Sequence, residues 1–377
     1  MKHDENLLMV ADSEHDANML YAVGMFVPDP FIYLRLRDRQ YVVMSDLEVD
    51  RARKEAVGCR VLSLNEHQRK LRRAGSARAG FAEVVQLILQ EKRVTSVVVP
   101  ANFPLGLAVD LQHLGVKVKP RAGTFFAERE LKTPAEVKKI SAALMMAEVG
   151  MAEGIQALRT SKVGKNRQLV YHGAPLTSEK LRSIIDTAIL QAGGVANRTI
   201  VAGGKQGCDP HEPGHGPLCA DEPIILDIFP RSQKTGYFGD ITRTVVRGRA
   251  SETVRKLYDT VHTGQMLAFK KVRAQTPTHE VHKTVQDYFV AQGYKTGKRN
   301  GRMEGFFHGT GHGLGLEIHE APRLGSSSSG LLQPGYVVTV EPGLYYPEIG
   351  GVRLEDVALV TERSPRNLTR FEKNLEL

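Results

Sequence analysis

The chain has 377 residues, of which 41% are hydrophobic and 25% charged, which is typical of a globular protein with a large core and predicts two domains. Its net charge of +9 raises nucleic-acid binding as an alternative, but the basic residues are scattered and lack aromatic interleaving, so a solvated basic surface is the preferred interpretation. No apolar run approaches the roughly 20 residues of a membrane span, and the first residues contain no apolar signal core. Three cysteines without metal-ligand spacing add to the prediction of a cytoplasmic protein with reduced thiols.

The N-terminal third alternates segments typical of strands and of helices. Short apolar runs predict strands at 7–11, 31–36, 41–45 and 95–100, the second and third joined as a hairpin. Segments with helical patterns are found at 13–24, 46–56, 78–93 and 104–115. We therefore expect a mixed α/β domain whose sheet is covered by helices, without a cluster of catalytic residue types.

A domain boundary is predicted near residues 123–133. Thr133-Pro134-Ala135-Glu136 is a capping box with proline in the first helical position. Apolar residues then recur at intervals of three and four, which predicts a long helix with one buried stripe made of Val137, Ile140, Leu144, Ala147, Met151, Ile155 and Leu158. Further helices are predicted at 176–192, 252–273 and 277–292.

Four carboxylates stand in apolar, strand-like runs of the C-terminal half. Asp227 and Asp240 belong to one pair of runs, PIILDIF and FGDITRT, and Glu341 and Glu355 belong to a second pair, TVEPGLYY and GVRLED. Burying an unpaired carboxylate costs several kcal/mol or more, so each of the four needs a compensating cation. The nearby Arg353 cannot match all four acids, whereas two divalent metal ions would.

A single acid in a strand is more often an edge residue or a salt-bridge partner. Two acid-bearing strand pairs of similar length, together with the glycine-flanked His312, are harder to explain in that way. Oxygen ligands with one imidazole suit Mn²⁺, Fe²⁺, Co²⁺ or Zn²⁺. Carboxylates that bridge two such ions form a hydrolytic two-metal site. Because helices separate the two strand pairs, we also expect an internal duplication with the site between its halves.

Together these residues resemble the M24 metallopeptidases of the pita-bread fold, in particular their Xaa-Pro aminopeptidase and prolidase branch. The resemblance rests on motifs in order along the chain, namely RELKTPAEVKKI, IVAGG…PHEPG, LDIF…GYFGDITRT, HGTGHGLGLEIHE, TVEPGLYY and GVRLEDVALVT. It implies an α/β (α+β) protein with a creatinase/prolidase-type N-terminal domain over 1–128. A pita-bread catalytic domain with a pseudo-two-fold repeat would follow over 129–377.

The resemblance also implies a ligand set for two divalent metal ions. The five positions that match the family's ligands are Asp227, Asp240, His312, Glu341 and Glu355. Asp240 and Glu355 would bridge the ions, and Glu341 would in addition act as general base. Mn²⁺ is the expected metal, with Co²⁺, Zn²⁺ and Fe²⁺ as alternatives.

Three further histidines match family positions beside the metals. His211 would contact substrate near the scissile bond and help proton transfer, although His215 competes for this assignment. His319 would bind the carbonyl oxygen and stabilise the tetrahedral intermediate. His308 would line the pocket for the residue after the scissile bond.

Two other side chains match family positions near the site, and one segment departs from the family pattern. Tyr345 would bind substrate, and Arg353 would orient carboxylates, which an ordinary salt bridge explains equally well. Thr242 shares a strand face with Asp240. The segment between Asp227 and Asp240 is longer than is usual in the family, which affects the pocket rim and the substrate range.

The implied function is hydrolysis of the bond between an N-terminal residue and proline in peptides, as by an Xaa-Pro aminopeptidase. Two alternatives are an Xaa-Pro dipeptidase (prolidase) and a non-catalytic binding protein on the M24 fold. Methionine aminopeptidase is disfavoured by the extra N-terminal domain, and a creatinase-type enzyme by the full ligand set. The resemblance implies a homodimer, and neither a membrane nor nucleic acid is expected as a partner.

Overall fold

The structure is a computed structural model that describes residues 5–377. It divides into two compact units, one ending at Ala127 and the other spanning Glu128–Leu377, and each is described by itself. Residues 1–4, the first part of the segment predicted to contain no signal core, lie outside the described residues. Among residues 5–377, no helix has both the length and the apolar character needed to cross a membrane.

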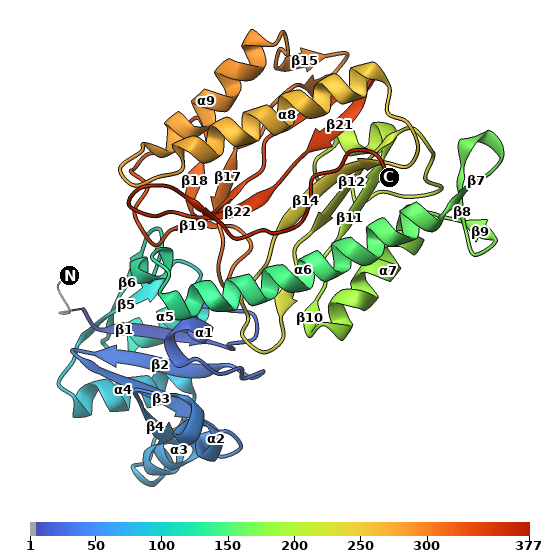
Figure 1. The fold of residues 1–377 in the computed structure, drawn as a ribbon. Coiled ribbons are helices and arrows are strands. Elements are labelled where there is room, and N and C mark those ends of the chain that lie inside the picture. The colour runs from blue at the N-terminus through green and yellow to red at the C-terminus, as the bar shows by residue number, and fades with distance from the viewer. Residues whose placement is uncertain (1–4) are drawn as a thin grey trace. The chain divides into compact units, whose positions relative to one another are not determined.

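The N-terminal unit is built on one mixed six-stranded sheet, shown in blue and cyan in Figure 1. In spatial order its strands are β4 (Cys59–Ser63), β3 (Arg39–Met44), β2 (Phe31–Leu36), β1 (Leu7–Ala11), β5 (Ser96–Pro100) and β6 (Lys117–Arg121). Its helices are α1 (Ala17–Val23), α2 (Val49–Glu55), α3 (Leu64–Arg73), α4 (Phe81–Glu91) and α5 (Leu105–His113). On β1, Leu8 joins one apolar cluster and Leu7 and Met9 join another, because successive side chains of a strand point to opposite faces. The sheet is therefore buried on both faces.

The four strands and four helices predicted for this unit are confirmed. The strands β4 and β6 and the helix α3 were not predicted. Helix α3 is rich in charged residues and buries none of its residues fully, and its only apolar side chains, Leu64 and Leu71, are too few to mark a stripe, although both pack against the core. It does begin at Ser63, whose side chain accepts a hydrogen bond from the Glu66 amide, and this spacing is a helix-start signal that the composition of the segment hides.

The C-terminal unit opens with the helix α6 (Pro134–Thr160), as predicted. The capping box is formed in both directions, since the Thr133 hydroxyl accepts from the Glu136 amide and the Glu136 carboxylate accepts from the Thr133 amide. All seven residues of the predicted apolar stripe are buried. The helix packs beside α7 (Ser178–Gln191) and supports a three-stranded antiparallel sheet of β11 (Ile200–Gly203), β12 (Pro223–Ile228) and β14 (Ile241–Val246).

The second half of this unit repeats the plan of a helix pair on a sheet. Helices α8 (Glu252–Lys271) and α9 (Thr278–Ala291) match the predicted ranges. They cover a five-stranded sheet with the order β18 (Glu320–Leu324), β17 (Gly311–Gly313), β19 (Val337–Val340), β22 (Asp356–Leu359) and β23 (Arg366–Asn367). Figure 1 shows β12, β14, β21 and β22 between the α6/α7 pair and the α8/α9 pair.

Short elements complete the C-terminal unit. The hairpin of β20 (Gly343–Tyr346) and β21 (Gly350–Arg353) carries residues into the site. The remaining short strands are β7 (Lys162–Val163), β8 (Leu169–Tyr171), β9 (Ala174–Pro175), β10 (Gly194–Val195), β13 (Arg231–Ser232), β15 (Gly297–Arg299) and β16 (Arg302–Glu304). The 3₁₀ turns are η1 (Ala127–Glu130), η2 (Lys165–Arg167) and η3 (Gly204–Cys208).

Candidate metal centre

A cavity of about 680 Å³ in the C-terminal unit gathers nearly all of the predicted site residues. Its lining includes the five predicted ligands and four of the other predicted side chains, namely Asp227, Asp240, His312, Glu341 and Glu355, with His211, His308, His319 and Arg353. Tyr345 lies beneath this lining and is fully buried. These residues come from segments more than a hundred positions apart, and the fold brings them together.

The four acids reach the cavity from strand ends more than from strand interiors. Asp227 lies within β12, as predicted. Asp240 immediately precedes β14, Glu341 follows β19, and Glu355 lies between β21 and β22, so the prediction that all four stand inside strands is wrong for three of them. At a strand end the backbone leaves the ladder, and the carboxylate can turn into a cavity without facing a neighbouring apolar side chain.

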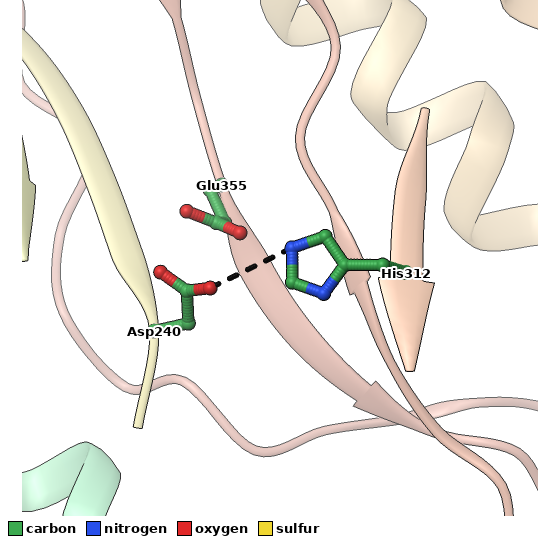
Figure 2. A group of neighbouring side chains, drawn as sticks. All are labelled: Asp240, His312 and Glu355. Carbon is green, nitrogen blue, oxygen red and sulfur yellow. Dashed lines mark ion pairs between the residues drawn. The ribbon is translucent and has the colours of Figure 1, made fainter. Parts of the chain in front are cut away.

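Asp240, His312 and Glu355 are the group best placed to hold a metal ion. One ligand atom of each lies within 4.8 Å of the others, and all three residues are buried. Figure 2 shows the two carboxylates and the imidazole pointing toward one another, with the His312 Nε2 atom 3.7 Å from the Asp240 Oδ2 atom. Glu341 extends the group, since its Oε1 atom lies 3.2 Å from the same Nε2 atom.

Two carboxylate oxygens at the site are buried without a hydrogen-bond partner among the described residues. The Thr242 hydroxyl donates to Glu355 Oε2 at 2.8 Å, and the Arg353 guanidinium donates to Asp227 Oδ2 at 2.7 Å. The other oxygen of each carboxylate, Glu355 Oε1 and Asp227 Oδ1, has no partner within residues 5–377. A buried oxygen of this kind is costly unless a cation binds it, so the donor set fits a metal site.

His312 is held with one nitrogen free for a ligand. Its Nδ1 atom lies 3.1 Å from the Gly313 carbonyl, and its amide donates to the Thr339 hydroxyl at 3.1 Å. A ring N–H that donates to a carbonyl leaves Nε2 as the metal-binding atom. The flanking glycines are required sterically, because a Cβ at Gly311 would lie 2.0 Å from the Thr339 carbonyl oxygen and one at Gly313 would lie 2.1 Å from that of Ala321.

The electrostatics of the site call for added positive charge. Burial raises the pKa of Asp240 well above its ordinary value, and the neighbouring Glu355 and Asp227 carboxylates raise it further. Burial likewise raises the pKa of Glu355 well above its ordinary value, with the Glu341 carboxylate as the next cause. The carboxylates cannot all ionise in this space without a cation, which is the condition that divalent metals satisfy.

A chain of hydrogen bonds links His308 to Asp227. His308 Nε2 lies 2.8 Å from the Tyr345 hydroxyl, which accepts from Arg353 at 3.0 Å. Arg353 then donates to Asp227, and its guanidinium is buried. Burial lowers the pKa of His308 to about 4, which keeps its imidazole neutral. The predicted site residues Tyr345 and Arg353 therefore orient other residues of the site through direct contacts.

Two other predicted histidines, His211 and His319, line the cavity. His215, the alternative to His211, does not. The His319 ring packs edge to face on His312 with centroids 4.4 Å apart. Burial lowers the pKa of His319 to about 4, and the neighbouring His312 and Arg323 lower it in the same direction. His211 lines the cavity, whereas His215 has a mainly exposed side chain and pairs with Glu212 at 3.5 Å. Of the two alternatives, His211 is the one that the cavity exposes to a ligand.

Arg323 is a cavity residue that the sequence did not reveal. It lies on β18 directly opposite His312 on β17, and its side chain is exposed in the cavity. No ion-pair partner for it is found among the described residues. Its neighbour relation depends on the β17–β18 register, which shifts at a bulge between His312 and Gly313, so no local pattern could have indicated it.

Buried carboxylates around one imidazole at the base of a cavity form the type of site that metal-dependent hydrolases use. A sequence model of the family described as "Metallopeptidase family M24" matches residues 138–362, which is more than half of the chain. The chain belongs to this metallopeptidase family, and the predicted resemblance is confirmed.

Known proteins of similar sequence align with this chain over part of their length. The chain is 33% identical over 247 residues to the uncharacterized peptidase YqhT of Bacillus subtilis, an alignment with 60% of this chain and 67% of that protein. It is 33% identical over 178 residues to an Xaa-Pro dipeptidase of Pyrococcus furiosus, with 47% of this chain and 48% of that protein aligned. The chain thus spans about half the length of that dipeptidase.

Solved structures resemble the whole chain. An Xaa-Pro dipeptidase from Bacillus anthracis superposes with a TM-score of 0.81 at 24% identity, covering 99% of this chain and 95% of that one. An X-Pro aminopeptidase from Thermotoga maritima superposes with a TM-score of 0.82 at 20% identity, covering 99% and 97%. These likenesses confirm the predicted fold class, an N-terminal α/β domain followed by a pita-bread domain.

Proposed function

We propose that this metallopeptidase hydrolyses the peptide bond between an N-terminal residue and a following proline. The observation that carries the proposal is the cluster of Asp227, Asp240, His312, Glu341 and Glu355 at one cavity of an M24 chain. The relatives named above as Xaa-Pro dipeptidase and X-Pro aminopeptidase support the substrate class. The amide before proline is tertiary and resists general peptidases, so a dedicated site is needed to cleave it.

The five side chains would hold two divalent ions. Asp240, His312 and Glu355 form the centre of the cluster, and together with Glu341 and Asp227 they would hold the ions. We propose Mn²⁺ as the native metal, with Co²⁺, Zn²⁺ and Fe²⁺ as alternatives that the same donors accept. When bound, two such ions acidify water and polarise the scissile carbonyl.

The remaining catalytic work falls to three side chains. Glu341 accepts the proton of the attacking water, since its carboxylate lies at the cavity surface and is hydrogen-bonded by the Thr339 hydroxyl. His319 hydrogen-bonds the carbonyl oxygen where negative charge develops, because its ring stands beside His312 and faces the cavity. His211, exposed at the cavity, assists proton transfer to the leaving nitrogen.

Three side chains bind and orient. Arg353 fixes the Asp227 carboxylate, and Tyr345 fixes both Arg353 and His308. His308 is held neutral by burial and presents its ring to the residue after the scissile bond. This arrangement sets the shape of the pocket before substrate enters, which lowers the entropic cost of binding.

Two peptide lengths remain candidates, and Arg323 favours the shorter one. An aminopeptidase would accept longer peptides through the open cavity. A dipeptidase needs a cation to bind the carboxylate of the proline itself. Arg323 supplies such a guanidinium, since it is exposed in the cavity and has no ion-pair partner among the described residues.

The test uses metal-stripped protein with Gly-Pro and Gly-Pro-Ala, with and without Mn²⁺, Co²⁺ or Zn²⁺. Metal-dependent cleavage of either peptide supports the proposed function. Cleavage of Gly-Pro that falls in Arg323→Gln, but not in the matched exposed variant Arg302→Gln, supports the dipeptidase. If Arg323→Gln cleaves Gly-Pro and Gly-Pro-Ala at equal rates, the result supports the aminopeptidase. Protein that binds no metal and cleaves neither peptide would favour a non-catalytic binding protein on the same fold.

We also propose that the protein is a cytoplasmic homodimer. The family resemblance is the basis for the dimer, and the three cysteines without metal-ligand spacing, expected as reduced thiols, are the basis for the location. Sedimentation equilibrium would test the dimer, and fractionation of the source cells would test the location. A monomer in sedimentation would leave the proposed chemistry intact, because all the side chains named above come from one C-terminal unit.

A further inference from the structure

A buried ion network joins the start of the C-terminal unit to the segment that carries His319. The Lys132 ammonium lies 2.5 Å from Glu320 Oε1, and the Arg129 guanidinium lies 2.8 Å from Glu320 Oε2. The same Arg129 nitrogen lies 2.8 Å from Glu317 Oε2. The side chains of Lys132, Arg129 and Glu320 are 1%, 6% and 9% exposed, so three of the four charges are out of water.

The network is anchored on both sides by backbone contacts. The Lys132 amide donates to the Gly335 carbonyl at 2.9 Å, just before β19. Glu320 begins β18, which pairs with the β17 strand of His312. A Cβ at Gly315 would lie 2.3 Å from Glu320 Oε1, so glycine there leaves room for the buried carboxylate.

Stability alone is a weak reason for such a network. Removing charges from water is costly, and the attraction between them roughly offsets that cost. The network does fix the position of the Glu320 carboxylate, because a separate cation holds each of its two oxygens. The position of Glu320 is thereby tied to residues 188 and 191 positions away in sequence.

His319 lies between the two glutamates. Glu317 precedes it by two positions and Glu320 follows it directly. The His319 ring has its own packing contact on His312, with centroids 4.4 Å apart. The ion network and this ring contact therefore fix the same short segment from its two sides, one at the backbone and one at the side chain.

We propose that Lys132 and Arg129 are positioning residues that hold Glu320, and through it place the His319 imidazole at the cavity. This inference rests on the proposed function for the role of His319, but the placement itself does not depend on activity. Neither cation lines the cavity, so both act through Glu320. A loss of the network would let the segment 317–320 shift relative to His312.

The test compares Lys132→Met, Glu320→Gln and the double variant with Lys283→Met. Lys283 is a matched control, because it forms an ion pair with Asp287 in which both side chains are more than 60% exposed. We expect kcat on the better Xaa-Pro substrate to fall about 10- to 100-fold in each network variant, since displacement of about 1 Å costs on this order. KM and bound metal should stay unchanged, and the double variant should lose less than the product of the two single losses.

A spectroscopic measurement separates placement from activity. In histidine-labelled protein, metal-free or loaded with diamagnetic Zn²⁺, the His319 ring signals are assigned with His319→Gln. They should move in Lys132→Met and Glu320→Gln but not in Lys283→Met, while the signals of the exposed His113, on α5 of the N-terminal unit, stay in place. Should Lys132→Met fail to fold, Glu320→Gln keeps the side-chain shape and carries the test.

The outcomes distinguish the two proposals. If wild type cleaves no Xaa-Pro peptide while the His319 signals still move in the variants, the proposed function fails and the positioning role stands. If wild type is active but kcat and the His319 signals are unchanged in Lys132→Met and Glu320→Gln, the positioning role is wrong. A change of KM or metal content with unmoved His319 signals would also overturn it.

Discussion

Two clusters of polar and charged side chains lie on consecutive residues of the same two segments and face opposite ways. Thr242 and Glu355 are hydrogen-bonded on the cavity side. The next residues, Arg243 and Asp356, form an ion pair at 2.9 Å on the other side, with both side chains 1% exposed. Adjacent strand residues alternate in direction, so one pair of segments supplies both clusters.

The outer cluster, Arg243 with Asp356, is fully satisfied by the protein. Arg243 donates to the carboxylate of Asp356 and to the carbonyls of Thr242, Glu355, Phe371 and Glu372. Asp356 also accepts from Asn367 and pairs with Lys373. The inner cluster consists of the five predicted metal ligands at the cavity, Asp227, Asp240, His312, Glu341 and Glu355. In contrast to the outer cluster, it leaves Asp227 Oδ1 and Glu355 Oε1 without partners among residues 5–377. Buried oxygens without partners in the inner cluster, against complete hydrogen bonding in the outer one, distinguish a binding site from a structural ion pair.

The largest expected effect comes from breaking the inner cluster. Asp240→Asn keeps the size of the side chain but removes one negative charge from the centre of the proposed metal site. We expect metal-dependent cleavage of Gly-Pro and Gly-Pro-Ala to be lost. The metal-free variant should be at least as stable as wild type, because burial and neighbouring carboxylates already disfavour the Asp240 charge. Urea unfolding with EDTA and a peptidase assay measure the two quantities, and retained activity would contradict the assignment.

The next largest effect comes from breaking the outer cluster. Arg243→Met leaves Asp356 buried with one of its two cations removed and strands four carbonyls. Loss of one partner of a buried pair costs about 3–5 kcal/mol of unfolding free energy. Urea unfolding of the metal-free protein checks this, with the exposed Arg366→Met on β23 as the matched control. A loss no larger than in the control would mean that the outer cluster contributes little to stability.

Added metal should raise the unfolding free energy only where the inner cluster is intact. A ligand that binds only the folded state at 100 times its Kd stabilises it by about 2.7 kcal/mol. Wild type and Arg366→Met should show this gain on addition of Mn²⁺ or Zn²⁺, whereas Asp240→Asn should show a much smaller one. The measurement is the unfolding free energy with and without metal. An equal gain in Asp240→Asn would place the metal elsewhere.

Much of the fold could be predicted from local patterns. The Thr133 capping box and the stripe from Val137 to Leu158 predicted α6, because helical period and capping are short-range properties. The β15–β16 hairpin was not predicted, although its Asn300-Gly301 turn, with both residues at positive φ, is a strong hairpin signal. The flanking residues are basic and mostly exposed and show no alternating apolar pattern, so the turn signal stands without the strand pattern that usually accompanies it.

The candidate site could be predicted in its residue types but not in its supporting contacts. Acids in apolar runs indicated Asp227 and Glu355, since a buried carboxylate is costly wherever it occurs. Arg243, Arg323 and Lys132 were missed because their partners lie far away in sequence. No period or spacing encodes the register that places Arg323 opposite His312, or the chain path that brings Lys132 to Glu320.

The smallest expected effect is a pH dependence at the outer cluster. His262 stacks on Tyr258 and is near Lys373 and Arg243 as well as Asp259 and Asp356. Burial, followed by the Lys373 charge, lowers the pKa of His262 from its ordinary value of 6.5, while the two aspartates oppose this shift. The unfolded chain therefore binds more protons here, and stability that is present above about pH 6.5 is lost as the pH falls toward the folded pKa.

His262→Gln should remove this loss and leave the inner cluster untouched. Between about pH 7.5 and about pH 5.5, the unfolding free energy of wild type should fall more than that of His262→Gln. Urea unfolding of both proteins at the two pH values, at equal metal loading, isolates His262 because all other titrations cancel in the difference. Parallel pH profiles would mean that His262 titrates alike in the folded and unfolded chain. The two aspartates, Asp259 and Asp356, would then offset both the burial of His262 and the charges of Lys373 and Arg243, and the outer cluster would favour neither protonation state of His262.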